Sequence, residues 1–353
     1  MMNPTTHRIA APVALLLCIS SATLADPPPD YYDSVDASNS TTLRVTLHEA
    51  IDDHQRFPYT SSSTDTWDIL NQADSDPNDS GNILDVYRNA SYPKINGGVR
   101  DYNREHTWPK SYGFPDNTSN NYPYTDCHML SLCDGGYNSS RSNNPYRDCN
   151  AGCSERTTLA NNGQGGGSGE YPGNSNWRTG SGSGGTWETW IGRRGDVARA
   201  LLYADIRYEG GTHGGTGHSE PDLILTDDGN LIVTSSDNEP VAHMGMLSVL
   251  LQWHVEDPVD DLELNRNDVV FSFQNNRNPF IDNPEWVACL FLDECDAACP
   301  QDLDGDGQVE AFDLAILLGS WGPCEGCPTD FNGDRVVDAF DLAQVLGAWG
   351  LCP

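Results

Sequence analysis

The chain has 353 residues and carries 52 acidic side chains against 19 lysines and arginines, which gives a formal net charge of −33. This length suits one large domain plus a small one. The charge argues against a protein whose whole surface binds a polyanion, because such surfaces are basic. Residues 88–207, however, hold 13 basic and 11 acidic side chains. The acidic segments on either side are typical of proteins that are highly soluble or tolerate high salt. The nearly balanced segment between them would not repel a phosphate chain.

Residues 1–25 show the three-part pattern of an export signal. Arg8 supplies the positive start, an apolar run follows from Ala10 to Ile19, and small residues lead to Ala25. The apolar run is too short to span a bilayer, and no later stretch is long and apolar enough to do so. We therefore expect a secreted protein, extracellular or periplasmic, without a membrane span, and we expect it to be a monomer.

The chain contains 11 cysteines, of which Cys18 lies in the expected signal. An even number in the mature part of an exported protein predicts disulfides, although the sequence does not give their pairing. Zinc ligation by Cys149 with Cys153, or by Cys324 with Cys327, is the alternative. The ten mature cysteines are Cys127, Cys133, Cys149, Cys153, Cys289, Cys295, Cys299, Cys324, Cys327 and Cys352.

The hydrophobic pattern predicts helices on both sides of an irregular middle. Val197, Leu201 and Tyr208 fall near one helical stripe, and the glycine runs within 161–186 are typical of a flexible surface loop. In chain order, the expected elements are helical parts within 30–100, short strands, turns and loops over 101–150, the flexible loop over 161–186, a helix over 195–208, a second helix over 243–254 and an ordered loop over 275–284.

Three short motifs lie inside the nearly balanced segment. They are Asn-Arg-Glu-His-Thr-Trp-Pro at 103–109, Asp-Cys-His at 126–128 and Asn-Ser-Ser-Arg-Ser-Asn at 138–143. Cutting a phosphodiester in water needs a base, a cation that offsets charge, and groups that position the strand. Histidine suits the base, a carboxylate with an amide oxygen suits hydrated Mg²⁺, and arginine suits phosphate. The three motifs together therefore indicate a phosphodiester-cutting site.

These motifs resemble the signature of the endonuclease I family, exported bacterial nucleases of the ββα-metal (His-Me) finger type. The resemblance covers roughly residues 40–292, including the helix from Arg194 and the run from Gln274 to Pro284. It implies an α+β fold, in which a ββα-metal finger core is surrounded by helices. We expect this catalytic domain over residues 26–296.

The resemblance also implies roles for individual residues. His106 matches the general base that activates water. Glu105 and Asn138 match the ligands of a catalytic Mg²⁺, for which Mn²⁺ or Ca²⁺ can substitute. Arg141 matches a family arginine that either binds phosphate or has a structural role. The remaining expected support residues of the site are Asp126 and His128.

Two features of the site stay open at this stage. Neighbouring residues on a strand face opposite ways, so Glu105 and His106 can serve one site only at a strand end or a bend. Some family members carry an arginine between the first two motifs, whereas residues 107–125 here contain Lys110 as their one lysine or arginine. Lys110, Arg141 or an arginine from elsewhere are the candidates for stabilising the transition state.

The expected function is hydrolysis of DNA, and also of RNA, by a secreted metal-dependent endonuclease with little sequence specificity. The family's products carry a 5′-phosphate and a 3′-hydroxyl. Two alternatives come from other classes of protein. One is a non-catalytic, nuclease-like extracellular binding module, and the other is a secreted phosphodiesterase acting on small nucleotides.

The last part of the chain contains a repeat, because residues 302–314 return as 330–342. Each copy resembles an EF-hand-like calcium loop, and the pair over 297–353 resembles a small α-helical type I dockerin. An acidic turn without metal is the alternative. The expected ligands of structural Ca²⁺ are Asp302, Asp304, Asp306, the carbonyl of Gln308 and Asp313 in the first loop, and Asp330, Asn332, Asp334, the carbonyl of Val336 and Asp341 in the second.

The repeats depart from the dockerin pattern at two points. Gly307 fills the sharp-turn position of the first loop, whereas Arg335 fills it in the second, so we expect weaker calcium binding there. Both copies carry Ala-Phe, at 311–312 and 339–340, where cohesin-binding dockerins have small polar residues. The expected role is therefore contact with an extracellular protein partner other than cohesin, or a cap on the C-terminus.

Overall fold

The computed structural model describes residues 27–95, 101–149, 152–167, 169–295, 300–304, 307–324, 327–332 and 335–351. The expected signal segment, residues 1–25, lies outside these ranges. Within them, no helix combines the length and the apolar character needed to cross a membrane. The helices up to residue 295 are α1 (Ser40–Ile51), α2 (Thr66–Ala73), α3 (Gly135–Arg141), α4 (Arg194–Arg207), α5 (Leu247–Glu256), α6 (Asp261–Gln274), α7 (Pro279–Asp282) and α8 (Trp286–Leu292).

The strands of this part form several small sheets, so the fold is a mixture of helices and strands, consistent with the expected α+β class. Strands β1, β2 and β3 form one sheet and β6, β7 and β8 another, while β4 pairs with β5 and β9 with β10. Their bounds are β1 (Ser75–Asp76), β2 (Asp79–Leu84), β3 (Ser91–Pro93), β4 (Tyr102–His106), β5 (Leu130–Asp134), β6 (Ser154–Thr157), β7 (Ser175–Thr179), β8 (Thr186–Glu188), β9 (Asp222–Leu225) and β10 (Val241–Met244).

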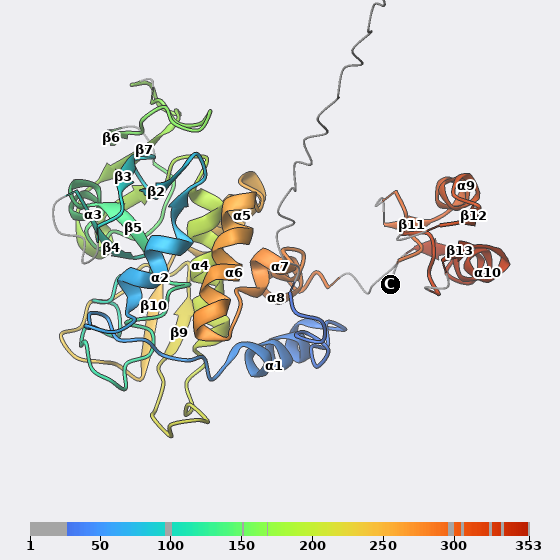
Figure 1. Cartoon of the computed structure of the whole chain (residues 1–353), viewed down its shortest axis with the longest axis horizontal. Helices are drawn as coiled ribbons and strands as arrows, with labels where there is room; N and C mark the ends of the chain where they lie inside the picture. Colours follow the sequence, from blue (N-terminus) through green and yellow to red (C-terminus); the bar gives the residue numbers. More distant parts are fainter. Residues whose placement is uncertain are drawn as a thin grey trace, which may run out of the picture.

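Helix α4 lies at the centre of the helical part of this fold (Figure 1). Its bounds confirm the helix expected over 195–208, and it packs against α1, α5, α7 and β9. Nearly all its side chains are buried, not only the predicted stripe of Val197, Leu201 and Tyr208. A helix buried on all sides belongs to the core rather than to the surface.

Two arginines of α4 are buried, and each has acidic partners. Arg207 donates to the two carboxylate oxygens of Glu220 at 3.0 and 2.9 Å, and its Nη1 lies 2.6 Å from Asp52. Arg199 forms a similar two-point pair with Glu263 of α6. A buried charge is tolerated only when it is paired and hydrogen-bonded. These pairs therefore fix α6 and the loop after α4 against the central helix.

The short strands expected within 101–150 include the hairpin of β4 and β5, which pair antiparallel from Tyr102 opposite Asp134 to His106 opposite Leu130. Helix α3 follows β5 directly, because the Asp134 side chain caps its first turn by accepting from the amides of Gly136 and Tyr137. One face of the hairpin packs on α2 and α6 through a separate apolar cluster. The other face is left to α3.

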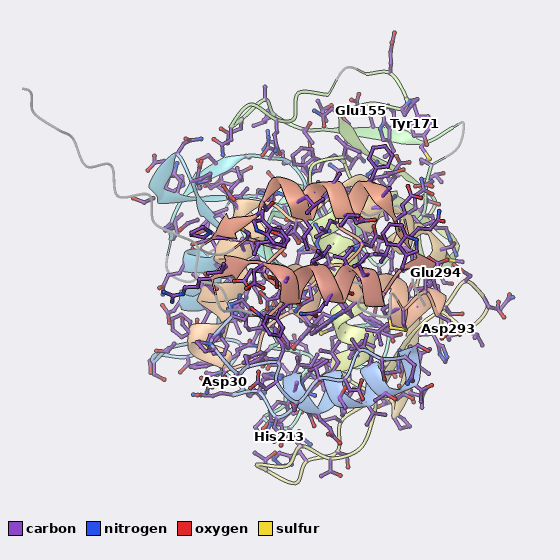
Figure 2. All side chains as sticks on the ribbon, turned by 90° about the vertical axis from the view of Figure 1, so that its right-hand side faces the viewer. Asp30, Glu155, Tyr171, His213, Asp293 and Glu294 are labelled. Carbon is purple, nitrogen blue, oxygen red and sulfur yellow. A yellow bond between two sulfur atoms is a disulfide. The ribbon has the colours of Figure 1, made fainter. Side chains whose placement is uncertain are left out.

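The glycine-rich segment 161–186 contains more structure than expected. Strand β7 lies inside it and pairs with β6 on one side and with β8, which begins at Thr186, on the other, and Trp177 of β7 is buried. The prediction of a flexible surface loop is therefore wrong for residues 175–179, because burying this large aromatic side chain orders the strand. Glu155 and Tyr171 mark this region at one end of the molecule, opposite the loop that carries His213 (Figure 2).

The second expected helix, over 243–254, begins later than predicted. Residues Val241–Met244 form β10, which runs parallel to β9, and α5 begins at Leu247. A short apolar run is compatible with the periodicity of a helix and with that of a strand. Here every second residue, Ala242 and Met244, is buried, as in a strand. The sequence pattern does not predict helix α6, and the loop expected over 275–284 contains the short helix α7.

The repeated segment folds as two copies of one unit. Each copy consists of a short strand, a helix and a second short strand, and the copies are joined by two small antiparallel pairs. A common apolar cluster of Val309, Leu317, Cys324, Val337 and Val345 lies between them. The elements are β11 (Gln308–Val309), α9 (Ala311–Gly319), β12 (Gly322–Pro323), β13 (Val336–Val337), α10 (Ala339–Gly347) and β14 (Gly350–Leu351).

The cysteines form short-range disulfides. Cys149 pairs with Cys153, Cys289 with Cys295 and Cys324 with Cys327, so the two pairs considered as zinc ligands are disulfides instead. Two further cysteines, Cys127 and Cys133, are buried and free. The prediction that the cysteines of the mature chain form disulfides therefore does not hold for these two, while Cys299 and Cys352 lie outside the described residues.

Candidate functional site

The predicted base and carboxylate lie at the end of β4. Glu105 is paired with Ser131 and His106 with Leu130 across the hairpin. Because neighbouring residues of a strand face opposite ways, Glu105 lies on the face covered by α3 and His106 on the face toward α2. Strand β4 ends at His106, so a ligand that contacts both side chains has to lie across the end of the strand.

His106 is a buried imidazole whose tautomer is fixed by the backbone. Its Nε2 lies 3.0 Å from the carbonyl oxygen of Tyr124. A carbonyl oxygen can only accept, so Nε2 carries the ring proton and Nδ1 keeps its lone pair. Burial lowers the pKa of His106 to about 3, against the opposing effect of the hydrogen bond to Tyr124. The ring is therefore neutral near pH 7, with Nδ1 as the basic atom.

Glu105 is a buried carboxylate held by a tyrosine and an arginine. The hydroxyl of Tyr87 donates to Glu105 Oε1 at 3.0 Å, and the hydroxyl of Tyr146 lies 2.9 Å from that of Tyr87. Arg141 Nε is 3.5 Å from the same carboxylate oxygen. Burial raises the pKa of Glu105 to about 7, although Arg141 and Tyr87 act in the opposite direction. A carboxylate in these surroundings is stabilised in its ionised form by a further cation.

Asn138 lies on α3, over the face of β4 that carries Glu105. Its Nδ2 donates to Asn103 Oδ1 at 2.7 Å and to the carbonyl of Arg104 at 3.3 Å. The carbonyl of Arg104 can only accept, so the Asn138 atom beside it must be the amide nitrogen. The other side-chain atom is then the oxygen, Oδ1, which turns away from both acceptors. No described residue donates to this oxygen. The side chain thus presents an amide oxygen beside a face that also holds a carboxylate.

Arg141 is fully buried, with an exposed fraction of 0%. Its guanidinium donates to the carbonyl of Thr107 at 2.8 Å and to that of His106 at 3.5 Å. Its Cζ lies 4.7 Å from the ring centre of Tyr146. Of the two roles implied by the family resemblance, these contacts favour the structural one, in which Arg141 holds the chain immediately after β4.

Asp126 and His128 lie in the interior beyond the hairpin. Asp126 Oδ2 accepts from the hydroxyls of Tyr203 and Tyr208 of the α4 segment, at 2.8 and 2.9 Å. Burial alone would raise the pKa of Asp126, but His54, His128 and its hydrogen bonds hold it below the usual range. His128 Nε2 lies 3.0 Å from the carbonyl of Asn276. These contacts join the loop before β5 to α4.

Two groups around the site were not singled out from the sequence: Tyr87 contacts the carboxylate, and the Tyr124 carbonyl fixes the imidazole. Lys110, one of the candidate cations, has its Nζ 2.9 Å from the Tyr124 hydroxyl. A backbone carbonyl has no signal in the sequence, because every residue has one. Tyr87 lies 18 residues before Glu105, and only the tertiary fold brings them together.

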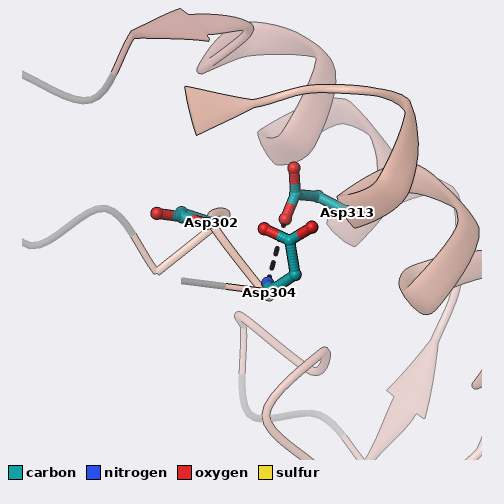
Figure 3. A group of neighbouring side chains, drawn as sticks. All are labelled: Asp302, Asp304 and Asp313. Atoms are coloured by element: carbon teal, nitrogen blue, oxygen red, sulfur yellow. Dashed lines mark hydrogen bonds between the residues drawn. The ribbon is translucent and has the colours of Figure 1, made fainter. Parts of the chain in front are cut away.

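The first repeat of the C-terminal segment brings carboxylates together. Oxygens of Asp302, Asp304 and Asp313 all lie within 4.8 Å of one another (Figure 3). The Asp313 carboxylate also accepts from the amides of Leu303 at 2.6 Å and Glu310 at 2.7 Å. Among the described residues, this is the group of acidic, histidine or cysteine side chains with the spacing of a metal site.

The second repeat has a similar internal geometry. Asp341 accepts from the amides of Phe331 and Asp338 at 2.9 and 2.8 Å. The sharp-turn residues have φ values of 83° at Gly307 and 70° at Arg335. This confirms that both loops require a left-handed residue at that position, which favours glycine. The predicted ligands Asp306 and Asp334 lie outside the described residues.

Comparison with known proteins gives the family of the chain. Residues 39–285 match the family model described as Endonuclease I. The chain is 36% identical over 276 residues to the extracellular ribonuclease of Bacillus subtilis (strain 168), covering 77% of this chain and 82% of that protein. It is 36% identical over 260 residues to the extracellular ribonuclease of Bacillus amyloliquefaciens, covering 73% and 76%.

The match to the family model contains the whole hairpin and α3. The family match and the two relatives show that the protein is a nuclease, an enzyme that acts on phosphodiester bonds. The chain belongs to the endonuclease I family, as the motifs at 103–109, 126–128 and 138–143 predicted.

The buried contacts of Arg141 generate a prediction about stability. Arg141→Met leaves the buried Glu105 without its ion-pair partner and removes donors from two carbonyls. Breaking a buried pair in this way costs about 3–5 kcal/mol, so we expect the free energy of unfolding in urea to fall by about this amount. Arg178→Met, at a half-buried arginine whose Nη2 donates to the nearby carbonyl of Gly180, should change it by about 0.5 kcal/mol or less. Unchanged stability with lost nuclease activity would instead assign Arg141 to the substrate.

Proposed function

We propose that this nuclease is an extracellular, metal-dependent endonuclease that hydrolyses DNA and RNA with little sequence preference. The observation that carries the proposal is the fixed tautomer of His106, whose Nε2 proton is committed to the Tyr124 carbonyl. Nδ1 is thereby left as a base within a neutral ring. Action on RNA and an extracellular location are supported by the two relatives, which are named extracellular ribonucleases.

We assign the metal ligands to Glu105 and Asn138, within a ββα-metal finger formed by β4, β5 and α3. Their donor atoms fit Mg²⁺, since a carboxylate and an amide oxygen are hard ligands and water can complete the shell. The surroundings agree, because Glu105 is buried and the Asn138 amide is held with Oδ1 free of described donors. When bound, the cation supplies charge stabilisation to the phosphate and the departing oxygen.

The protein's own residues then account for the proton transfers. His106 Nδ1 takes a proton from the attacking water, whose oxygen forms a bond to phosphorus as the bond to the 3′-oxygen breaks. The products carry a 5′-phosphate and, after the 3′-oxygen takes a proton from solvent, a 3′-hydroxyl. Arg141 holds the backbone of residues 106 and 107, and Asp126 and His128 fix the loop that leads into β5. Lys110 lies beside Tyr124 and is an exposed cation on the side of the base.

We also propose that residues 297–353 are a dockerin-like module that binds structural Ca²⁺ through its two loops. The clustered carboxylates of the first loop and the matching amide contacts in the second support this. Asp306, Gln308, Asp330, Asn332, Asp334 and Val336 complete the proposed ligand sets. The repeats also expose large apolar side chains, including Phe312 and Phe340 at 68% and 72%, as expected of a module with an extracellular protein partner.

Removing the base tests the proposed mechanism. His106→Ala should lower kcat by at least about 100-fold, since a positioned general base contributes on the order of 10²–10⁴-fold. The fold should remain intact by circular dichroism. The matched control is His218→Ala, which removes an exposed histidine and should leave kcat unchanged.

The same assay separates the alternative functions when it compares plasmid DNA, RNA and a small chromogenic phosphodiester. The proposal requires cleavage of the polymers. Turnover of the small diester alone would indicate a phosphodiesterase, and no turnover of any substrate would indicate a binding module. A near-normal rate in His106→Ala would show that another group is the base.

Metal dependence tests the assigned ligands. EDTA should abolish cleavage and Mg²⁺ should restore it. Asn138→Ala should raise the Mg²⁺ concentration needed for half-maximal activity by about 10-fold or more, since one ligand is lost. Ser139→Ala, on the exposed side of the same helix, should not. Cleavage that persists in EDTA would contradict the metal-assisted mechanism.

Calcium binding can be tested at the left-handed residue of the second loop. A non-glycine residue in this conformation costs about 1–2 kcal/mol, so Arg335→Gly should tighten Ca²⁺ binding by about 5–30-fold in calorimetric titrations of the full chain. Gly307→Ala should weaken binding at the first loop for the same reason. Equal affinities in all three proteins would show that the turn does not limit binding.

A further inference from the structure

Four planar groups are layered on the face of β4 that carries His106. The Cζ of Arg104 lies 4.2 Å from the ring centre of Trp67 and 3.3 Å from that of Tyr59. The ring of Tyr59 is in turn stacked on the imidazole of His106, with 5.8 Å between centres and 20° between planes. Arg104 and His106 share this face because they are two residues apart on one strand.

Arg104 binds the segment that carries Tyr59. Its Nη1 donates to the carbonyl of Tyr59 and, at 2.7 Å, to Thr66 Oγ1, while Nη2 donates to Thr60 Oγ1 at 3.1 Å. Its side chain is buried, with an exposed fraction of 8% for the residue. No ion pair of the described residues includes this arginine. The buried cation is therefore held by two aromatic faces and by neutral acceptors.

The imidazole needs more than its single hydrogen bond to be held in one orientation. The contact of Nε2 with the Tyr124 carbonyl fixes one atom, but the ring plane can still pivot about that direction. The Tyr59 face and the edge of the Tyr124 ring, whose centre is 4.9 Å away at 67°, restrict the plane from two directions. Misplacing a reacting group by about 1 Å can cost on the order of 100-fold in rate.

We propose that Tyr59, held in place by Arg104, is a positioning residue that keeps Nδ1 of His106 aimed at the attacking water. This inference rests on the proposed function, since it assumes that His106 is the base. Tyr59 acts through the face of its ring, so its hydroxyl is dispensable. Arg104 acts through its planar fork, which binds one segment while stacking between two rings.

The experiment compares Tyr59→Phe with Tyr59→Leu in steady-state cleavage of RNA. Tyr59→Phe keeps the stacked ring and should retain kcat within about twofold. Tyr59→Leu removes it and should lower kcat about 10-fold or more with KM unchanged, because positioning the base affects the chemical step rather than binding. Arg104→Lys, which keeps the charge but loses the fork, should lower kcat about as much as Arg104→Met.

A spectroscopic measurement keeps the test independent of activity. The imidazole carbon-bound protons of His106, identified by their absence in His106→Ala, should show an upfield ring-current shift in the wild type and in Tyr59→Phe. This shift should disappear in Tyr59→Leu. Thermal unfolding of each variant shows whether a loss of activity comes from unfolding. If Tyr59→Leu or Arg104→Met does not fold, Tyr59→Met and Arg104→Lys take their places in the comparison with the wild type.

The outcomes separate the inference from the proposed function. Unchanged kcat in Tyr59→Leu, or an increase in KM alone, would overturn the positioning role, and the second result would place Tyr59 on the substrate. A His106→Ala variant that remains active would overturn the proposed base itself. Loss of activity in His106→Ala, with retention in Tyr59→Phe and a kcat defect in Tyr59→Leu, supports both.

Discussion

The position at which β4 ends is the constraint on which the site depends. Glu105 and His106 are adjacent, so the pleat of the strand sends their side chains to opposite faces. Had β4 continued, the strand itself would separate the carboxylate from the imidazole. The strand ends at His106, and Arg141 binds the carbonyls of residues 106 and 107. A phosphate lying across this end can reach groups from both faces.

Burial disfavours the charged form of both His106 and Glu105, and the consequence differs between the two side chains. The imidazole is kept neutral because a buried ring resists a positive charge, and this leaves Nδ1 unprotonated near pH 7. The carboxylate resists its own negative charge in the same way, so it is stabilised as an anion by cations, of which Arg141 is one. Burial on the two faces of the strand thus keeps the imidazole neutral and makes the ionised carboxylate depend on neighbouring cations.

The strongly acidic composition is compatible with this chemistry because the basic residues are concentrated in one segment and many are used inside the fold. Arg199 and Arg207 pair with carboxylates around α4, and Arg104 stacks between aromatic rings. All three arginines are buried. In the C-terminal segment, by contrast, the carboxylates of Asp302, Asp304 and Asp313 lie close to one another.

The sequence by itself determined the family, the central helix and the order of the motifs, because local periodicity and short motifs are properties of neighbouring residues. It also determined that Arg335 occupies a turn that favours glycine. Only the tertiary structure decided that the glycine-rich segment contributes a buried Trp177 to a sheet, that β10 precedes α5, and that Tyr59, Tyr87 and the Tyr124 carbonyl surround the site. Those contacts join residues far apart in the chain, and no local pattern encodes which aromatic ring or carbonyl will lie beside a given histidine.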